Sequence, residues 1–408
     1  MRTWLSAWIV IAVWAASAPS LVHRGLDAGF YFEAAARVAR GESPYVEGGG
    51  YIYPPPLAAA LSLLPCSPEQ LNLGWNALLM LSAVVAIALG MRAAGFRSTA
   101  WSGLAYLLLF SQPVRWGLQL GNASLLLAGL LALAAALLPR RPALAGVVIG
   151  IAALVKVIPA IFLGWLAALH FRQARLRALA SDSGPAFDDA REGPEPRLLR
   201  GPEVRSPWLT ATMAAGLAVL LGALSGDNAG YLHAKAAEVQ SRVALGANFS
   251  ILSVIERAFG LSLPGALAPL LGAAAAVGVG LRTPAGRRAL LASWGIVQLI
   301  AIVSTPVAWS HLFVLAYWPA LVAAGQLFRV TQLATTRERQ LDALLFALAV
   351  LILARTALWF SPDHFTGRVI LPLAPLFALF VLGAFLLREL REPTPAWPPH
   401  KELPGSHG

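Results

Sequence analysis

Apolar runs recur along this 408-residue chain, most of them close to the length that crosses a lipid bilayer. An α-helix needs about 20 such residues to cross the hydrocarbon core. Only 12% of the residues are charged and 58% are hydrophobic, whereas a soluble domain carries about a quarter charged residues. The sequence therefore predicts an all-α integral membrane protein.

The basic residues indicate how the spans are oriented. If the N-terminus lies in the cytoplasm, the inner loops hold 21 of the 31 Lys and Arg residues and the outer loops hold 8. That asymmetry is typical of multi-pass proteins, so the net charge of +11 sets orientation and does not indicate a nucleic-acid partner. We expect a protein of the inner (plasma) membrane with both termini cytoplasmic. Its twelve expected spans are residues 4–20, 70–90, 98–112, 121–138, 143–155, 157–170, 208–225, 263–281, 288–304, 310–328, 341–360 and 369–387.

One stretch, residues 143–170, allows two interpretations. A single helix of this length would measure about 42 Å, against a hydrocarbon core of about 30 Å. Lys156 and Pro159 interrupt it near the middle. Two short spans that meet at the outer surface, or one tilted helix kinked at the proline, both satisfy the pattern.

The spans define a domain organisation. We expect an N-terminal module over residues 1–170 and a C-terminal transmembrane module over residues 208–387. The polar residues 171–207, rich in Arg, Asp, Glu, Gly and Pro, predict a flexible cytoplasmic loop, and residues 388–408 predict a disordered cytoplasmic tail.

Asp27 follows the first span at the outer membrane surface, where water keeps a carboxylate ionised. Residues 28–40 after it have the pattern of an amphipathic helix that includes an i,i+4 pair of Glu33 and Arg37. A carboxylate in this place could take the proton from an acceptor hydroxyl. It could instead cap the helix, and the sequence leaves both roles open.

Three cations are candidates for a phosphate site. Lys156 lies in an apolar stretch, where a charge is expected to face a cavity, a partner or the interface. Arg115 and Arg368 lie in outward segments and could share the phosphate. The alternatives are a snorkelling lysine and two interfacial anchors.

Several polar and aromatic side chains could bind a sugar or its acceptor. Asn122, Asn248 and Ser250 could donate hydrogen bonds to sugar hydroxyls, and Trp309 with His311 could form a platform for a sugar ring. Loop caps and interfacial residues of the same types are common. In the topology derived from charge, however, all five lie on the outer side.

These segments, in their order, resemble glycosyltransferase family 87, the polyprenyl-phosphate-mannose-dependent mannosyltransferases of the GT-C superfamily. The resemblance is carried by Asp27 with Tyr31, Tyr45 and Tyr53-Pro54-Pro55, by Gly121-Asn122, by Lys156-Val-Ile-Pro159, by Asn248-Phe-Ser250, and by Trp309-Ser-His311. Where members of the family usually have Gly-Gln-x-Asn, this chain has Gly121-Asn-Ala-Ser124.

The resemblance implies a GT-C-type helical bundle that transfers a sugar, mannose by expectation, from a polyprenyl phosphate to a lipid or glycan acceptor. Transfer is expected outside the cytoplasm with inversion at the anomeric carbon, Asp27 acting as base and Lys156 with Arg115 or Arg368 binding the phosphate. Tyr31, Tyr45 and Tyr53 are expected to join the sugar and acceptor site. No cofactor and no metal site are assumed. A lipid or solute transporter and a non-catalytic membrane scaffold remain the alternatives.

Overall fold

The computed structural model describes residues 25–46, 50–96, 102–182, 206–224, 226–242, 248–330, 336–354 and 371–391. All regular elements in these ranges are helices, which confirms the all-α class. Their bounds are α2 Leu26–Ala39, α3 Pro55–Ser62, α4 Pro68–Ala94, α5 Ser102–Leu109, α6 Gln112–Leu120, α7 Ser124–Leu137, α8 Pro142–Val155, η3 Ile158–Ala160, α9 Ile161–Asp182, α10 Pro207–Ala223, α11 Asn228–Arg242, α12 Ile251–Phe259, α13 Leu267–Arg282, α14 Arg287–Ser304, η6 Ser310–Ala316, α15 Tyr317–Val330, α16 Thr336–Ala354 and α17 Leu371–Arg391.

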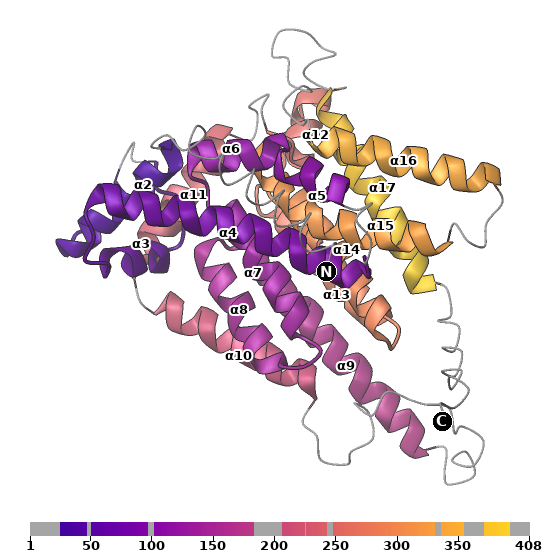
Figure 1. Ribbon diagram of the computed structural model, residues 1–408. Coiled ribbons are helices and arrows are strands. Elements are labelled where there is room, and N and C mark those ends of the chain that lie inside the picture. The colour runs from indigo at the N-terminus through magenta and orange to yellow at the C-terminus, as the bar shows by residue number, and fades with distance from the viewer. Residues whose placement is uncertain are drawn as a thin grey trace, which may run out of the picture.

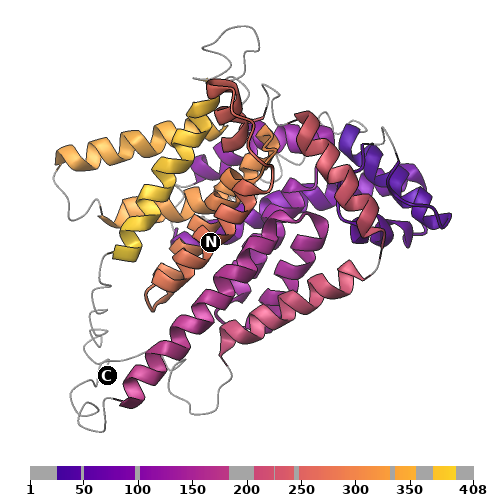
Figure 2. The ribbon, with the colours of Figure 1, turned by 180° about the vertical axis from the view of Figure 1, so that it is seen from behind.

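The helices form an elongated bundle in which the N-terminal elements α2 and α3 lie at one end and α16 and α17 at the other (Figures 1 and 2). Helix α4 runs through the middle and packs against α7 and α15. Helix α8 packs against α7 and α10, and α9 packs against α13. The far end of α9 extends beyond the rest of the bundle in both views.

Two of the described helices, α4 and α14, are long and apolar enough to cross a membrane by themselves. Two bent pairs raise that number to four if each pair counts as one span, and shorter apolar helices lie at 142–155, 267–282, 311–327 and 373–388. These helices fit a membrane protein. The twelve-span topology stays a prediction, and the first expected span, 4–20, lies outside the described residues.

Local sequence signals account for the longest of these helices. Ser67 is the N-cap of α4 and accepts a hydrogen bond from the Gln70 backbone, while the Gln70 side chain accepts one from the Ser67 backbone. This reciprocal capping box satisfies two backbone donors at the start of the helix. Pro68 occupies the first turn, and Gly95 ends the helix in the left-handed region with φ of 81°.

The stretch 143–170 is broken at Lys156. Helix α8 ends at Val155, and Lys156 adopts an extended conformation with φ of −157° and ψ of 131°. The turn η3, which contains Pro159, then leads into α9. Pro159 has no backbone N–H to continue the α8 hydrogen-bond ladder, which accounts for the interruption here.

Helix α9 continues to Asp182, so residues 171–182 are helical although no helix was expected from 171 onward. The segment is rich in Ala, Leu, Arg and Gln, all good helix formers, and a helix already nucleated in the apolar part of α9 propagates through them. Residues 183–205, the rest of the expected loop, and the tail from residue 392 lie outside the described residues.

Candidate functional site

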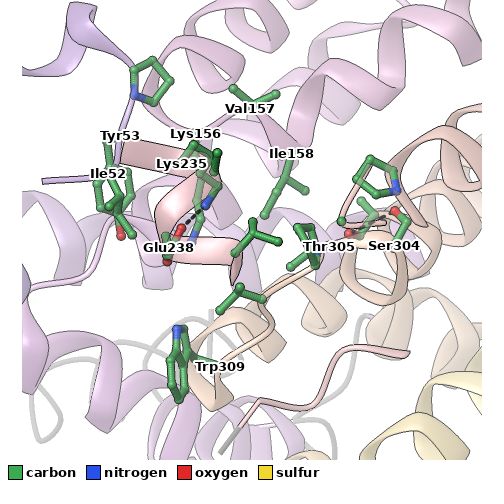
Figure 3. Close-up of a pocket in the computed structure, with 18 of the residues that line it drawn as sticks. Ile52, Tyr53, Lys156, Val157, Ile158, Lys235, Glu238, Ser304, Thr305 and Trp309 are labelled. Atoms are coloured by element: carbon green, nitrogen blue, oxygen red, sulfur yellow. Dashed lines mark hydrogen bonds and ion pairs between the residues drawn. The ribbon is translucent and has the colours of Figure 1, made fainter. Parts of the chain in front are cut away.

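A cavity of about 1100 Å³ lies among the N-terminal helices, α11 and the segment that precedes η6 (Figure 3). Its polar lining includes Asp27, Asn122, Lys156 and His311. Trp309 and Tyr53 also line it, so six of the twelve candidate site residues meet here. Much of the remaining wall is apolar and comes from the start of α9 and from α13 and α14.

Asp27 lies in the first turn of α2, and the N-cap of this helix is Gly25, which supplies no side-chain cap. The capping role considered for Asp27 is therefore not the one observed. Its Oδ2 atom instead accepts a hydrogen bond of 2.5 Å from Nδ2 of Asn122. Asp27 thus faces the cavity, with one oxygen held by a neutral donor.

Two glycines let the start of α2 approach the turn between α6 and α7. A Cβ atom on Gly25 would overlap the carbonyl of Leu120 and lie 2.6 Å from the nitrogen of Gly121. Gly121 itself has φ of 66° and ends α6. The chain then bends by 117° into α7, so Asn122 lies at the corner opposite Asp27.

An aromatic cluster holds this corner in place. The Tyr31 ring lies 4.8 Å from the Tyr53 ring and 5.4 Å from the Trp75 ring, in edge-on geometry. Trp75 Nε1 donates to the carbonyl oxygen of Gly121 at 2.8 Å, and the Ala123 backbone N–H donates to the Tyr31 hydroxyl at 3.3 Å. The cluster is buried, so both hydrogen bonds act in a region of low dielectric.

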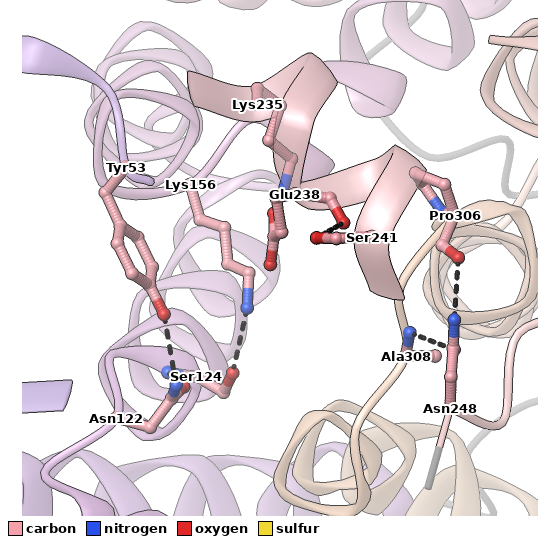
Figure 4. A network of polar contacts seen from close by, with 10 residues as sticks. All are labelled: Tyr53, Asn122, Ser124, Lys156, Lys235, Glu238, Ser241, Asn248, Pro306 and Ala308. Carbon is pink, nitrogen blue, oxygen red and sulfur yellow. Dashed lines mark hydrogen bonds and ion pairs between the residues drawn. The ribbon is translucent and has the colours of Figure 1, made fainter. Parts of the chain in front are cut away.

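Asn122 connects three parts of the site, as Figure 4 shows for two of its partners. Its Nδ2 atom donates to Asp27 and, at 3.1 Å, to the Tyr53 hydroxyl, while its Oδ1 atom accepts from the Ser124 backbone at 2.8 Å. All its amide hydrogens and its oxygen are thereby used, at 1% exposure. In this structure Asn122 positions Asp27 and Tyr53.

Lys156 lies in the turn between α8 and η3, and its Nζ atom donates to Ser124 Oγ at 3.5 Å (Figure 4). The same ammonium lies 5.6 Å from the centre of the Tyr53 ring. Burial and, to a smaller extent, repulsion by Lys235 lower the pKa of Lys156 to about 8, whereas Glu238 and Asp27 oppose the shift. The alternative of a snorkelling lysine does not describe this side chain, which points into the cavity.

Asn248 and Ser250 lie behind the cavity wall. Both are fully buried, and their side chains donate to the Pro306 carbonyl at 3.1 and 2.8 Å. Asn248 Oδ1 also accepts from the Ala308 backbone at 2.8 Å (Figure 4). These bonds fix the segment that carries Trp309 and His311, so we assign Asn248 and Ser250 to the support of that segment.

The other candidates divide into three cases. Tyr31 is fully buried behind Tyr53, and Tyr45 donates from its hydroxyl to the Tyr53 carbonyl at 2.7 Å, so both support the wall. Arg115 is exposed on α6 and is not part of the lining. Arg368 lies outside the described residues.

Two charged residues on α11 were not anticipated. Lys235 and Glu238 form an ion pair, and both line the cavity. Together with Tyr231 they occupy positions i, i+4 and i+7 of the helix, which places them on one face. The i, i+4, i+7 spacing could have been recognised in the sequence as one helix face. It does not by itself indicate a binding site, because a charged face on an outer helix is normally solvated.

The arrangement can support displacement at a carbon that bears a phosphate. It offers a carboxylate able to accept a proton, ammonium groups able to stabilise a departing anion, and apolar walls that fit a lipid chain. Within the described residues, no group of three or more His, Cys, Asp or Glu is placed to hold a metal ion.

Residues 51–183 match the family model described as Glycosyltransferase family 87. The matched region contains Tyr53, Asn122 and Lys156, whereas Asp27, Trp309 and His311 fall outside it. No curated protein matches the chain.

Proposed function

We propose that the chain acts as a member of glycosyltransferase family 87, whose model matches residues 51–183, and that it catalyses one specific reaction. The protein is an inverting glycosyltransferase that takes a sugar, mannose by expectation, from a polyprenyl phosphate. It transfers the sugar to a hydroxyl of a lipid or glycan acceptor on the extracytoplasmic face of the membrane.

The observation that carries the proposal is the meeting of Asp27 and Lys156 in one cavity, although 128 positions separate them in the sequence. Hydrogen bonds link the two through Asn122 and Ser124: Asn122 donates to Asp27 and accepts from the Ser124 backbone, and the Ser124 hydroxyl accepts from Lys156. An acid and an ammonium on one cavity suit a transfer in which a proton leaves the acceptor while charge develops on a phosphate.

The roles follow from the chemistry of displacement. Asp27 takes the proton of the acceptor hydroxyl as its oxygen attacks the anomeric carbon. The bond from that carbon to the phosphate oxygen breaks, and its electron pair leaves with the lipid phosphate. Lys156 stabilises the departing charge, and the buried surroundings strengthen that interaction.

The remaining residues orient the substrates. Tyr53, Trp309 and His311 line the cavity, where they can contact the sugar or the acceptor. The apolar side chains at the start of α9 and on α13 and α14 offer a path for the polyprenyl chain. Arg115 and Arg368 remain proposed auxiliary contacts to the phosphate or to lipid headgroups at the membrane surface.

The test is transfer by the full chain in proteoliposomes given labelled polyprenyl-phosphate mannose and an extract of membrane lipids. Asp27→Asn should lower transfer at least about 100-fold, because loss of a general base removes a factor of this size. Transfer within tenfold of wild type would remove Asp27 from the role of base. Movement of intact donor across the bilayer without transfer would instead support a transporter.

The matched control is Glu33→Gln on the same helix. Glu33 is an exposed acid that pairs with Arg37 and is not part of the cavity lining. An exposed i,i+4 pair contributes little to stability, so this variant should keep transfer within about twofold.

A further inference from the structure

The ion pair of Lys235 and Glu238 lies on the inner face of α11, against the cavity (Figure 3). The Glu238 side chain is only 4% exposed and that of Lys235 is 33% exposed. A carboxylate with so little contact with water is costly unless cations lie close by. Its position on a cavity wall indicates a role in what the cavity binds.

Glu238 lies close enough to Lys156 to attract it, while Lys235 lies close enough to repel it. In Figure 4 the Lys156 ammonium, from the turn after α8, and the Glu238 carboxylate, from α11, project toward the same space. Two ammonium groups and one carboxylate therefore share this side of the cavity. The formal charges of Lys156, Lys235 and Glu238 sum to +1.

The reaction proposed above changes the charge of the lipid phosphate. In the donor the phosphate is a diester and carries one negative charge. After transfer it is a monoester whose second pKa lies near 6, so at pH 7.5 it carries close to two negative charges. The proton released by the acceptor neutralises Asp27 in the same step, so the added negative charge appears on the phosphate side alone.

We propose that Lys235 and Glu238 complete the phosphate site and set its preference between the singly charged donor and the doubly charged product. The inference rests on the proposed function. Lys156 and Lys235 both face the phosphate, and Glu238 offsets one of these two cations. The site then holds the monoanionic donor yet does not retain the dianionic lipid phosphate after transfer.

The proposal predicts how much the affinities for the donor and for the product should change relative to each other. A change in site charge acts on a ligand in proportion to the charge of that ligand. If Glu238→Gln tightens donor binding by a factor f, it should tighten binding of the lipid monophosphate by about f squared. A threefold effect on the donor corresponds to about tenfold on the product.

The experiment measures binding of two probes, undecaprenyl phosphate mannose and undecaprenyl phosphate, to the full chain in nanodiscs at pH 7.5. Glu238→Gln should bind undecaprenyl phosphate about tenfold more tightly and the mannosyl diester about threefold. Lys235→Gln should weaken binding of both probes, again by about tenfold for undecaprenyl phosphate and about threefold for the mannosyl diester. In turnover assays, Glu238→Gln should show product inhibition at about tenfold lower undecaprenyl phosphate than wild type.

Two further variants keep the test informative. The double variant Lys235→Gln/Glu238→Gln restores the net charge and removes both partners of the pair, which is milder for folding than removing one; its affinities should return to within about threefold of wild type. Glu33 is an exposed acid outside the cavity lining. Glu33→Gln should therefore change both affinities by less than about twofold.

The inference would be overturned if the folded Glu238→Gln and Lys235→Gln proteins changed their affinity for the two probes by equal factors. It would also be overturned if neither affinity changed. Wild-type transfer alongside that result would leave the proposed function intact. A wild-type protein that binds neither probe and transfers no sugar would refute the proposed function, and the inference with it.

Discussion

Asn122 donates a hydrogen bond of 2.5 Å to Asp27 across a corner formed by three separate helices, α2, α6 and α7. The same amide also holds the Tyr53 hydroxyl and the backbone of Ser124. The direction in which Asp27 points therefore depends on a neutral side chain from a different helix. Activity of the carboxylate should be sensitive to a residue that carries no charge itself.

Asn122→Ala is expected to lower kcat about 10- to 100-fold, because a catalytic group that loses its orientation by about an ångström costs a factor of this order. The KM for donor should change little, since Lys156 remains in place. Steady-state kinetics in nanodiscs would separate the two effects. Asn76→Ala, a buried asparagine of α4, is the control; equal losses of kcat in both variants would contradict the positioning role.

Gly25→Ala is expected to reduce both stability and activity. The added Cβ atom would overlap the Leu120 carbonyl, and overpacking of this kind costs about 1–3 kcal/mol and shifts α2 away from the corner. Gly29→Ala, one turn along the same helix, meets no atom within 4 Å. It should stabilise the helix by up to about 1 kcal/mol.

Thermal unfolding and transfer assays on both glycine variants check this contrast. If Gly25→Ala keeps full transfer and an unchanged melting temperature, the close approach of α2 to the α6–α7 turn does not position Asp27.

The elements predicted from sequence are those whose signals are local. The amphipathic pattern after Asp27 is present as α2, and its Glu33–Arg37 pair forms. The break near Lys156 follows from Pro159, which acts on its immediate neighbours. Caps, prolines and apolar periodicity influence a few residues each, so a single sequence contains them.

The site was harder to predict because its geometry depends on tertiary contacts. Arg115, which stays a proposed phosphate contact, is exposed on α6 and outside the cavity lining, and its sequence carries no signal of that position. Asn248 and Ser250 have the chemistry of sugar ligands, yet backbone atoms of residues 306–308 use it. Glu238 carries no local signal of burial, because only the packing of α11 buries it.

Lys156 sets the alkaline limit expected for activity. Its pKa of about 8 results mainly from burial, which disfavours the charged form, and next from repulsion by Lys235. The ammonium is therefore present below pH 8 and is lost as the pH rises through about 8, so the KM for donor should rise there. Glu238, Asp27 and His311 also interact with Lys156 and complete its charged surroundings.

The measurement is the pH dependence of the donor KM between pH 6.5 and 10 for wild type and Lys156→Arg. An arginine stays protonated throughout this range, so the rise in KM should disappear in the variant even if its absolute activity is lower. A rise at the same pH in both proteins would assign the titration to another group.

Ser250→Ala should affect both folding and substrate binding. Ser250 is the N-cap of α12, where it accepts from the Ser253 backbone at 3.2 Å, and its hydroxyl also donates to the Pro306 carbonyl. Loss of a cap costs about 1 kcal/mol. Loss of the second bond should loosen the segment that presents Trp309 and His311, so the KM for donor should rise several-fold.

Ser67→Ala provides the matched comparison, because Ser67 caps α4 through a hydrogen bond of 3.3 Å and is exposed at the surface. Both variants should lower the unfolding temperature, and Ser250→Ala by more, because it removes a buried hydrogen bond to Pro306 in addition to a cap. Only Ser250→Ala should raise the KM, because only its hydroxyl also contacts the segment that lines the cavity. A normal KM in a folded Ser250→Ala protein would mean that Asn248 alone fixes that segment. The Asn248 carboxamide donates to the Pro306 carbonyl and accepts from the Ala308 backbone.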